Sequence, residues 1–249
     1  MRKIFKKYFR KIIFRFNYYF YIKPNLNDTV IVKLGGFRFV VYPTVFNPRD
    51  FLSSELFAKF IAGLELDKKN ILDMGSGSGV VSIIAASKGA ICTAVDINPM
   101  AVRSIKENAE FNGFGNKIKA IESDLFESIS FLSGMDKEKF FDIIFFNPPY
   151  YKGEPKNNFE RAFKGGNELE VVKIFAEQTP HYLKPEGIVY LILSSDVDID
   201  EFKKIFSGYS FEIVTNYNKF FETFYICKLV VNIHKAYLNE FPRKRESNL

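Results

Sequence analysis

From residue 70 onward, the sequence alternates short apolar runs with longer segments of helical periodicity. The apolar runs typical of strands are 70–73, 91–95, 117–121, 141–146 and 188–193. The segments with a helical spacing of apolar residues are 79–88, 99–111 and 167–179. Lys184-Pro185-Glu186-Gly187 predicts a turn that leads into the last strand. This alternation predicts an α/β fold, in which helical crossovers join parallel strands and cover both faces of the sheet.

Patterns on either side of this region extend the expected architecture. Two β-rich runs flank Gly35-Gly36, which predicts a hairpin over 30–42 with a two-residue turn. The apolar period over 50–62 predicts a helix. Near the other end, the runs 211–215 and 223–233 are joined by a short polar segment, which predicts an antiparallel pair at the edge of the sheet.

The positive charge of the chain is concentrated at its N-terminus. The 249 residues carry a net charge of +6, but the first 23 contain eight lysines and arginines and no acidic residue, so the remainder carries 27 − 29 = −2. Apolar and basic residues of this segment fall on opposite sides of a helical projection, which predicts an amphipathic helix. Two interpretations stay open: the helix docks on the body through its apolar face, or it binds an anionic surface such as lipid or RNA.

We therefore expect an extension of helix and hairpin over 1–45, a main domain over 46–235 and a polar tail over 236–249. Only two cysteines and two histidines are present, which argues against a disulfide framework and a metal site. No apolar run approaches the roughly 18 residues of a membrane span, and the N-terminus lacks the unbroken apolar segment of a secretory signal. A cytoplasmic protein without a transmembrane segment is expected.

The strongest local signal is the glycine-rich segment Asp73-Met74-Gly75-Ser76-Gly77-Ser78-Gly79, which stands between a strand-like run and a helix. Glycines in such a turn let the backbone approach a ligand, and the helix N-terminus adds a partial positive charge. A dinucleotide fingerprint requires glycine where Val80 stands, and a nucleophile elbow requires serine where Gly77 stands. The lysine of a phosphate-binding loop is absent. The pattern D-x-G-x-G-x-G resembles motif I of class I S-adenosylmethionine-dependent methyltransferases.

Two acidic residues follow the next strands of the alternation. Asp96 comes directly after the run 91–95, and Asp124 lies just beyond the run 117–121. Ligands of open α/β sheets bind at the carboxyl ends of strands, so we expect both acids to lie near the glycine turn. A carboxylate at position 96 can accept hydrogen bonds from two ribose hydroxyls, and one at position 124 can meet an adenine amine.

The tetrapeptide Asn147-Pro148-Pro149-Tyr150 follows the fourth strand. A strand ended by prolines would explain it structurally, but it also resembles motif IV of methyltransferases that act on planar amino groups. The lone pair of such a nitrogen is delocalised, so the nitrogen needs positioning more than a strong base. The side-chain oxygen of Asn147 and the backbone carbonyl of Pro148 can each accept one N–H. The two prolines stiffen the loop, and Tyr150 can stack on the flat acceptor.

Over about residues 47–229 the sequence resembles the HemK-type protein-glutamine methyltransferases, which modify the Gly-Gly-Gln motif of translation release factors. Beyond motifs I and IV, three segments carry this resemblance: Phe46-Asn47-Pro48-Arg49-Asp50, Phe163-Lys164-Gly165-Gly166-Asn167 and Glu222-Thr223. The resemblance implies a Rossmann-like class I methyltransferase fold with a mostly parallel seven-stranded sheet. The short segment before residue 47 departs from the bacterial release-factor enzymes, which carry a larger helical N-terminal domain, and is more similar to the eukaryotic and archaeal branch.

The resemblance also implies roles for individual residues. S-adenosylmethionine would be held by Asp73, Gly75, Gly77, Gly79, Asp96, Asp124 and Asn147. The acceptor would be held by Asn147, Pro148, Pro149 and Tyr150, with Asn147, Pro148 and Tyr150 as the catalytic set. The expected reaction is methylation of a glutamine side chain in a protein such as a release factor. Alternatives are N6-adenine or N2-guanine methylation of rRNA, tRNA or DNA, with the basic arm on phosphates, and methylation of a small-molecule amine.

Overall fold

The computed structural model describes residues 28–129, 141–219 and 222–232. The predicted basic helix 1–23 and the predicted polar tail 236–249 lie outside these residues. The main sheet consists of β3 (Asn70–Met74), β4 (Ile91–Asp96), β5 (Ile118–Glu122), β6 (Phe141–Phe146), β7 (Leu183–Ser194), β8 (Tyr209–Lys219) and β9 (Glu222–Val231).

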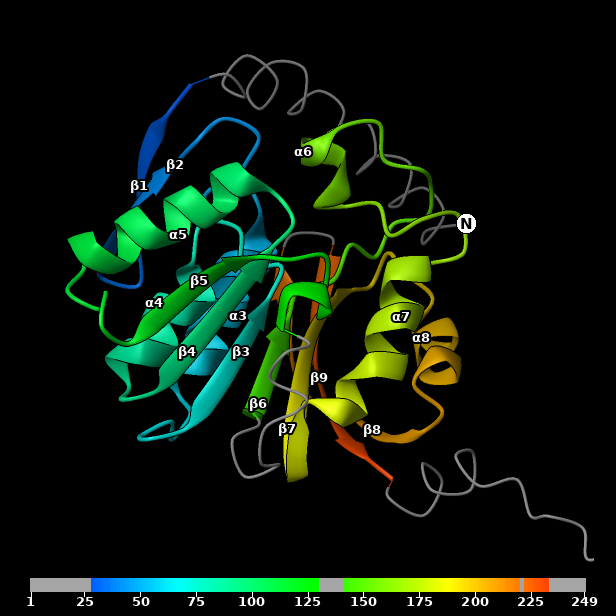
Figure 1. Cartoon of the computed structure of the whole chain (residues 1–249). Coiled ribbons are helices and arrows are strands. Elements are labelled where there is room, and N and C mark those ends of the chain that lie inside the picture. Colours follow the sequence, from blue (N-terminus) through cyan, green and yellow to red (C-terminus); the bar gives the residue numbers. More distant parts are fainter. Residues whose placement is uncertain (1–27, 130–140, 220–221, 233–249) are drawn as a thin grey trace, which may run out of the picture.

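The seven strands are arranged in the order β5-β4-β3-β6-β7-β9-β8 (Figure 1). The first five pair in parallel, whereas β9 is antiparallel to both β7 and β8. The order changes direction at β3, because the chain first builds outward to β4 and β5 and then returns to β6 on the other side. The predicted parallel sheet with an antiparallel edge pair is confirmed, and the reversal at β3 creates the crevice in which ligands of such sheets bind.

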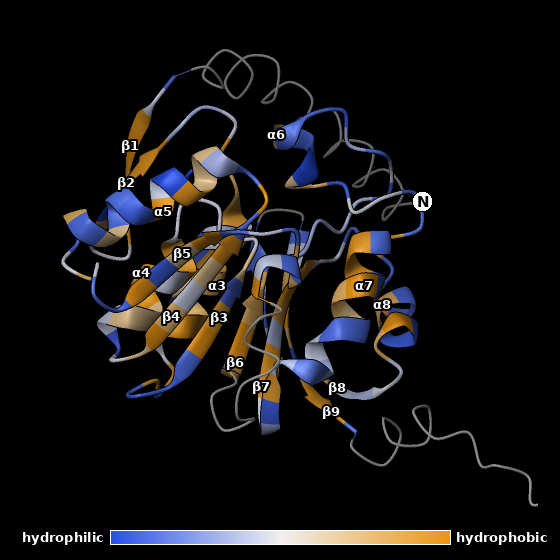
Figure 2. Ribbon diagram, viewed as in Figure 1, coloured by the Kyte–Doolittle hydropathy of each residue, from blue (hydrophilic) through white to orange (hydrophobic). Residues whose placement is uncertain are grey.

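Helices cover both faces of this sheet. They are α3 (Leu52–Ala62), α4 (Val80–Ser87), α5 (Pro99–Phe111), α6 (Asn158–Arg161), α7 (Glu170–Gln178), the 3₁₀ helix η4 (Thr179–His181) and α8 (Ile199–Ile205). Core residues of α3, α4 and α5 cluster on one face, and those of α7 and α8 cluster on the other. Successive residues of a strand alternate between the two clusters. In β3, for example, Ile71 belongs to the first cluster and Leu72 to the second, and both are fully buried. Figure 2 shows apolar residues along the strands and in α4, and polar residues mixed with apolar ones in α5 and α8.

The predicted hairpin is present as β1 (Val30–Leu34) and β2 (Phe37–Val41), which form a separate two-stranded sheet. It packs on α5, where Asn108 bonds to both backbone groups of Val40: the Val40 N–H donates to Oδ1 at 2.7 Å, and Nδ2 donates to the carbonyl oxygen at 2.9 Å. The ring of Phe39 is fully buried within the core cluster of α3, α4 and α5. The hairpin is therefore continuous with the hydrophobic core of the main body.

The expectation of a turn over 184–187 is corrected by the structure, which includes these residues in β7. Leu183 pairs with Phe141, and the register then shifts before Ile188 pairs with Ile143, so the extra residues form an irregularity within the strand. Glu186 has a φ of 62°, and this local bend accommodates the extra residues without ending the strand. The sequence pattern of residues 184–187 predicts this bend, but it does not show that β7 pairs with β6 on both sides of the bend.

The helical prediction over 167–179 is shifted at its start, because Leu169 has a φ of 60° and α7 begins only at Glu170. The sequence patterns also missed α8. Asp198 caps this helix by accepting hydrogen bonds from the Asp200 and Glu201 N–H groups, and Phe202 is buried beneath it. Within the described ranges, no helix is both long and apolar enough to cross a membrane.

Candidate active site

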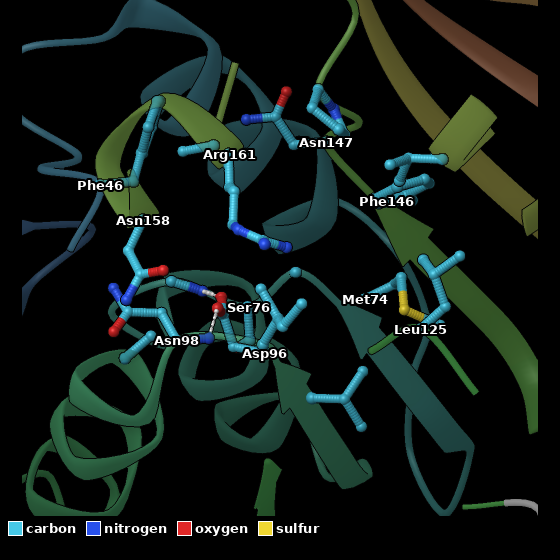
Figure 3. A pocket seen from close by; sticks show the side chains of 18 of the residues that line it. Phe46, Met74, Ser76, Asp96, Asn98, Leu125, Phe146, Asn147, Asn158 and Arg161 are labelled. Carbon is cyan, nitrogen blue, oxygen red and sulfur yellow. Dashed lines mark hydrogen bonds between the residues drawn. The ribbon is translucent and has the colours of Figure 1, made fainter. Parts of the chain in front are cut away.

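A cavity of about 460 Å³ opens where β3, β4, β5 and β6 end, and this volume is within the range of small-molecule sites. The glycine turn after β3 forms one wall, and the loop after β6 reaches the cavity from the other side of the sheet reversal. Residues from α6 and from the loop that precedes α3 also line it. Figure 3 shows these side chains converging on one space from segments far apart in the sequence.

The glycine turn adopts the conformation that its sequence predicts. Gly75, Gly77 and Gly79 have φ angles of 63°, 57° and 84°, which side chains other than glycine rarely adopt. Asp73 stabilises the turn from below, since its Oδ2 accepts a hydrogen bond from the Ser76 hydroxyl, another from the Ser82 hydroxyl at 2.7 Å and a third from the Ser82 N–H at 3.1 Å. Burial raises the pKa of Asp73 to about 6. Asp73 lines the cavity, and through these three hydrogen bonds its side chain stabilises the glycine turn.

Asp96 lies at the end of β4, as predicted, and lines the cavity. Its Oδ2 accepts the Gly77 N–H at 2.8 Å, and its Oδ1 accepts the Asn98 N–H at 2.9 Å (Figure 3). Burial raises the pKa of Asp96, and these backbone donors oppose the shift. The two bonds fix one carboxylate oxygen to the glycine turn and the other to the start of α5, and the side chain is only partly covered. Lone pairs on its cavity side can therefore meet ribose hydroxyls.

The structure places Asp124 on the same cavity, with an exposed side chain just beyond β5. Its neighbour Leu125, with a φ of 47°, also lines the cavity and supplies an apolar surface beside it. The structure therefore brings the acids predicted at the ends of β4 and β5 together with the glycine turn.

The Asn147–Tyr150 loop divides into two parts. Asn147 and Pro149 line the cavity, and the Asn147 amide nitrogen donates to the Ser53 hydroxyl of α3 at 3.4 Å. Pro148 and Tyr150 are not among the described residues that line the cavity, and the Tyr150 ring packs edge-on against Tyr151 with centroids 4.9 Å apart. Because Ser53 binds the amide nitrogen of Asn147, the amide oxygen is the atom left to accept a hydrogen bond.

The segment after this loop folds back on itself beside the cavity. Isolated β-bridges pair Tyr151 with Lys164 and Gly153 with Gly166. A Cβ atom on Gly165 would lie 2.3 Å from the backbone oxygen of Pro149, far inside van der Waals contact. Glycine at position 165 therefore lets the returning segment pass directly over the Asn147–Tyr150 loop.

An aromatic cluster of Phe46, Phe51 and Phe163 reaches the cavity through Phe46. Phe46 stacks on Phe51 at a centroid distance of 4.3 Å, and Phe163 lies 5.4 Å from the first ring and 4.9 Å from the second. Asn98, the cap of α5, donates from its Nδ2 to the Thr44 backbone and hydroxyl oxygens at 3.2 Å each. These bonds fix the loop before α3 to the start of α5.

Several of these lining residues were missed by sequence reasoning. Asn98 directly precedes Pro99, a recognisable helix-start signal that could have been used. By contrast, Asn158 and Arg161 of α6 line the cavity although no local pattern distinguishes them from solvated loop residues. Figure 3 shows both side chains extending from α6 toward the space above Ser76 and Asp96.

The cavity residues fit S-adenosylmethionine, because a glycine turn and the Asp96 carboxylate border one space of about 460 Å³. Fold and cavity define the class of the protein, an S-adenosylmethionine-dependent methyltransferase. Residues 37–221 match the model of the methyltransferase small domain family, and the chain belongs to that family.

Curated relatives extend this comparison. A putative protein N5-glutamine methyltransferase of Methanocaldococcus jannaschii is 36% identical over 172 residues, which covers 67% of this chain and 80% of the relative. The human methyltransferase HEMK2 is 33% identical over 61% of this chain and 70% of its own length. A tRNA1(Val) (adenine(37)-N6)-methyltransferase of a Flavobacteriaceae bacterium is 30% identical over 51% of this chain and 52% of its own.

Solved structures share the fold at low sequence identity. The Mtq2–Trm112 complex of E. cuniculi, which methylates the eRF1 termination factor, aligns with a TM-score of 0.54 and 21% identity, covering 76% of this chain and 99% of that one. The 16S rRNA N2 G1207 methyltransferase of T. thermophilus aligns with a TM-score of 0.53 and 22% identity, covering 81% of this chain but only 50% of that one. Both likenesses concern the fold alone.

Proposed function

We propose that this enzyme transfers a methyl group to a planar NH₂ group, namely the side-chain amide of a glutamine in a protein such as a translation release factor. The observation that carries the proposal is the Asn147 side chain at the cavity wall, with its amide nitrogen held by Ser53. The M. jannaschii relative, of which this chain covers 80%, supports the choice of glutamine.

The geometry explains how the chain would act on such an acceptor. The amide oxygen of Asn147 accepts one acceptor N–H. The backbone oxygen of Pro148 is proposed to accept the second after a shift of the loop, since Pro148 does not line the cavity in this structure. These bonds turn the nitrogen lone pair toward the cofactor and stabilise the positive charge that develops on it. S-adenosylmethionine supplies an electrophilic methyl group; a nitrogen–carbon bond forms as the sulfur–carbon bond breaks, and the nitrogen then releases a proton to solvent. Tyr150 would contact the flat acceptor only after a rotation, since its ring now packs on Tyr151.

The charge of the segment that follows the Asn147–Tyr150 loop favours a protein over a nucleic acid as the methyl acceptor. Residues 151–170 contain four cationic and four acidic side chains, so this segment is neutral. Lys152 pairs with Glu201 at 2.7 Å, and Lys164 pairs with Glu160 at 2.9 Å, so a neighbouring carboxylate compensates the charge of two of the four cations. Sequence-independent nucleic-acid binding depends on several unpaired cations along the backbone path.

Methylation of an exocyclic base amine in rRNA, tRNA or DNA is the second candidate. It is favoured by the Asn-Pro-Pro-Tyr sequence, which suits a flipped base as well as an amide, and by the basic segment 1–23. The Flavobacteriaceae relative named as a tRNA adenine methyltransferase supports it, although the match covers only about half of each chain.

The acceptor class is tested by labelling. The full chain and its Asn147→Ala variant are each incubated with tritiated S-adenosylmethionine and a cell extract, followed by protease or nuclease digestion. We expect Asn147-dependent label that protease releases and nuclease does not. A purified release factor should then accept label, and its Gly-Gly-Gln to Gly-Gly-Ala variant should not. Label lost to nuclease, or retained by the alanine variant, would overturn the glutamine proposal.

We further propose that the basic arm 1–23 contacts an anionic partner, and that the enzyme acts in the cytoplasm, where the buried free thiols of Cys92 and Cys227 suit reducing conditions. Deleting residues 1–23 should weaken binding to total tRNA or to phosphatidylserine vesicles, and full-chain binding should fall between about 50 and 200 mM salt. Unchanged binding combined with a lower melting temperature would instead indicate a helix docked on the body.

A further inference from the structure

We infer that Arg161 binds the carboxylate of the methionyl part of S-adenosylmethionine and so selects the complete cofactor. This inference deepens the proposed function and depends on it for the presence of that cofactor.

The short helix α6 is fixed in place, so the direction of Arg161 is set by the fold. Asn157 caps the helix, with its Oδ1 accepting the Glu160 N–H at 2.9 Å. The Phe159 ring is 8% exposed and packs edge-on against Phe163 at 5.1 Å, which anchors α6 to the aromatic cluster. Glu160 is bonded to Lys164 at 2.9 Å on the same segment.

With Phe159 anchored inward, the other face of the helix is presented to the cavity. Asn158 and Arg161 are three residues apart, so they lie on one side of the turn. Both line the cavity, and Figure 3 shows the Arg161 guanidinium extending into it between Asn147 and Ser76.

The charges of the cavity leave Arg161 as the cation available to an anionic ligand. Lys164, the other cation on the cavity wall, is paired with Glu160. Arg161 has no carboxylate within ion-pair distance among residues 28–129, 141–219 and 222–232. Two acids of the cavity wall, Asp96 and Glu170, are already engaged by backbone N–H groups.

S-adenosylmethionine carries one carboxylate, beside an ammonium and a sulfonium. The acids of the cavity suit its hydroxyls and its cationic groups, whereas its carboxylate requires a donor of opposite charge. A guanidinium binds a carboxylate through two parallel hydrogen bonds, a geometry that lysine does not reproduce. Figure 3 shows Ser76 of the glycine turn below the Arg161 guanidinium, so the carboxylate would lie between the turn and this side chain.

Calorimetry with two ligands tests the assignment on the full chain. S-adenosylmethionine and decarboxylated S-adenosylmethionine differ only in the carboxylate. We expect Arg161→Ala to weaken binding of the first by about ten- to a hundredfold, the usual range for a charge-assisted hydrogen bond, and to leave binding of the second unchanged. Arg161→Lys should recover part of the loss. Arg103→Ala is the matched control, since Arg103 stacks on Tyr42 and does not line the cavity.

Equal affinity of the wild type and Arg161→Ala for S-adenosylmethionine would overturn the inference, and so would an equal loss of affinity for both ligands. Neither outcome depends on the methyl acceptor, because no acceptor is present. Failure of the glutamine proposal would appear only in the labelling experiment, so the two failures are distinguishable.

Discussion

Replacement of Asn147 by alanine is expected to lower kcat by about a hundred- to a thousandfold, the loss typical of removing one preorganised polar contact to a developing charge. Asn147 lines the cavity, and its amide nitrogen is held by Ser53, so the lost group is the oxygen that orients the acceptor N–H. Steady-state methylation of a release-factor substrate measures the loss. Calorimetry should show that S-adenosylmethionine still binds within a few-fold of the wild-type affinity.

The design separates positioning from folding. Asn216→Ala, an exposed asparagine on β8, is the matched control and should retain wild-type kcat. Ser53→Ala should give an intermediate loss, because the Asn147 side chain remains but its orientation is no longer fixed. Full activity of Asn147→Ala would mean that this residue only ends β6.

Replacement of Asp96 by alanine is expected to raise the dissociation constant of S-adenosylmethionine by about a hundredfold or more, since hydrogen bonds to a charged acceptor are worth about 1.5–3 kcal/mol each. The carboxylate also accepts the Gly77 and Asn98 N–H groups, so the variant loosens the glycine turn as well. Asp96→Asn keeps the shape and one oxygen and should give a smaller loss. Equal affinity in calorimetry for wild type and Asp96→Ala would contradict the assignment.

The raised pKa of Asp96 adds a pH signature to this prediction. Burial favours the protonated carboxyl, which can donate a hydrogen bond but accepts fewer. Cofactor affinity should therefore fall as the pH is lowered through the pKa of Asp96, and this fall should be smaller in Asp96→Ala, in which Asp73 is left as the buried acid that holds the glycine turn. Asp200→Ala, an exposed acid on α8, should keep both the wild-type affinity and its pH dependence.

Much of the fold followed from the sequence because its signals are local. The alternation after residue 70 predicted the five parallel strands, and the glycine turn and Asp96 were predicted at strand ends that a parallel sheet brings to one edge. The structure places both there. The irregular start of β7 and the helix α8 were not predicted, because strand pairing and burial of Phe202 override weak local preferences.

The approach of Gly165 to the Pro149 oxygen, which folds the loop after β6 over the cavity, is a contact that no periodicity encodes. In the resulting arrangement Asn158 and Arg161 line the cavity, whereas Pro148 and Tyr150 do not.

By itself, the sequence determined the sheet, the glycine turn and the identity of the polar groups at the strand ends, because backbone geometry and short-range spacing specify them. Only the tertiary structure decided which side chains of the loop after β6 meet the cofactor cavity. Their direction depends on contacts between segments distant in the chain, and the free energy of those contacts comes from packing in three dimensions.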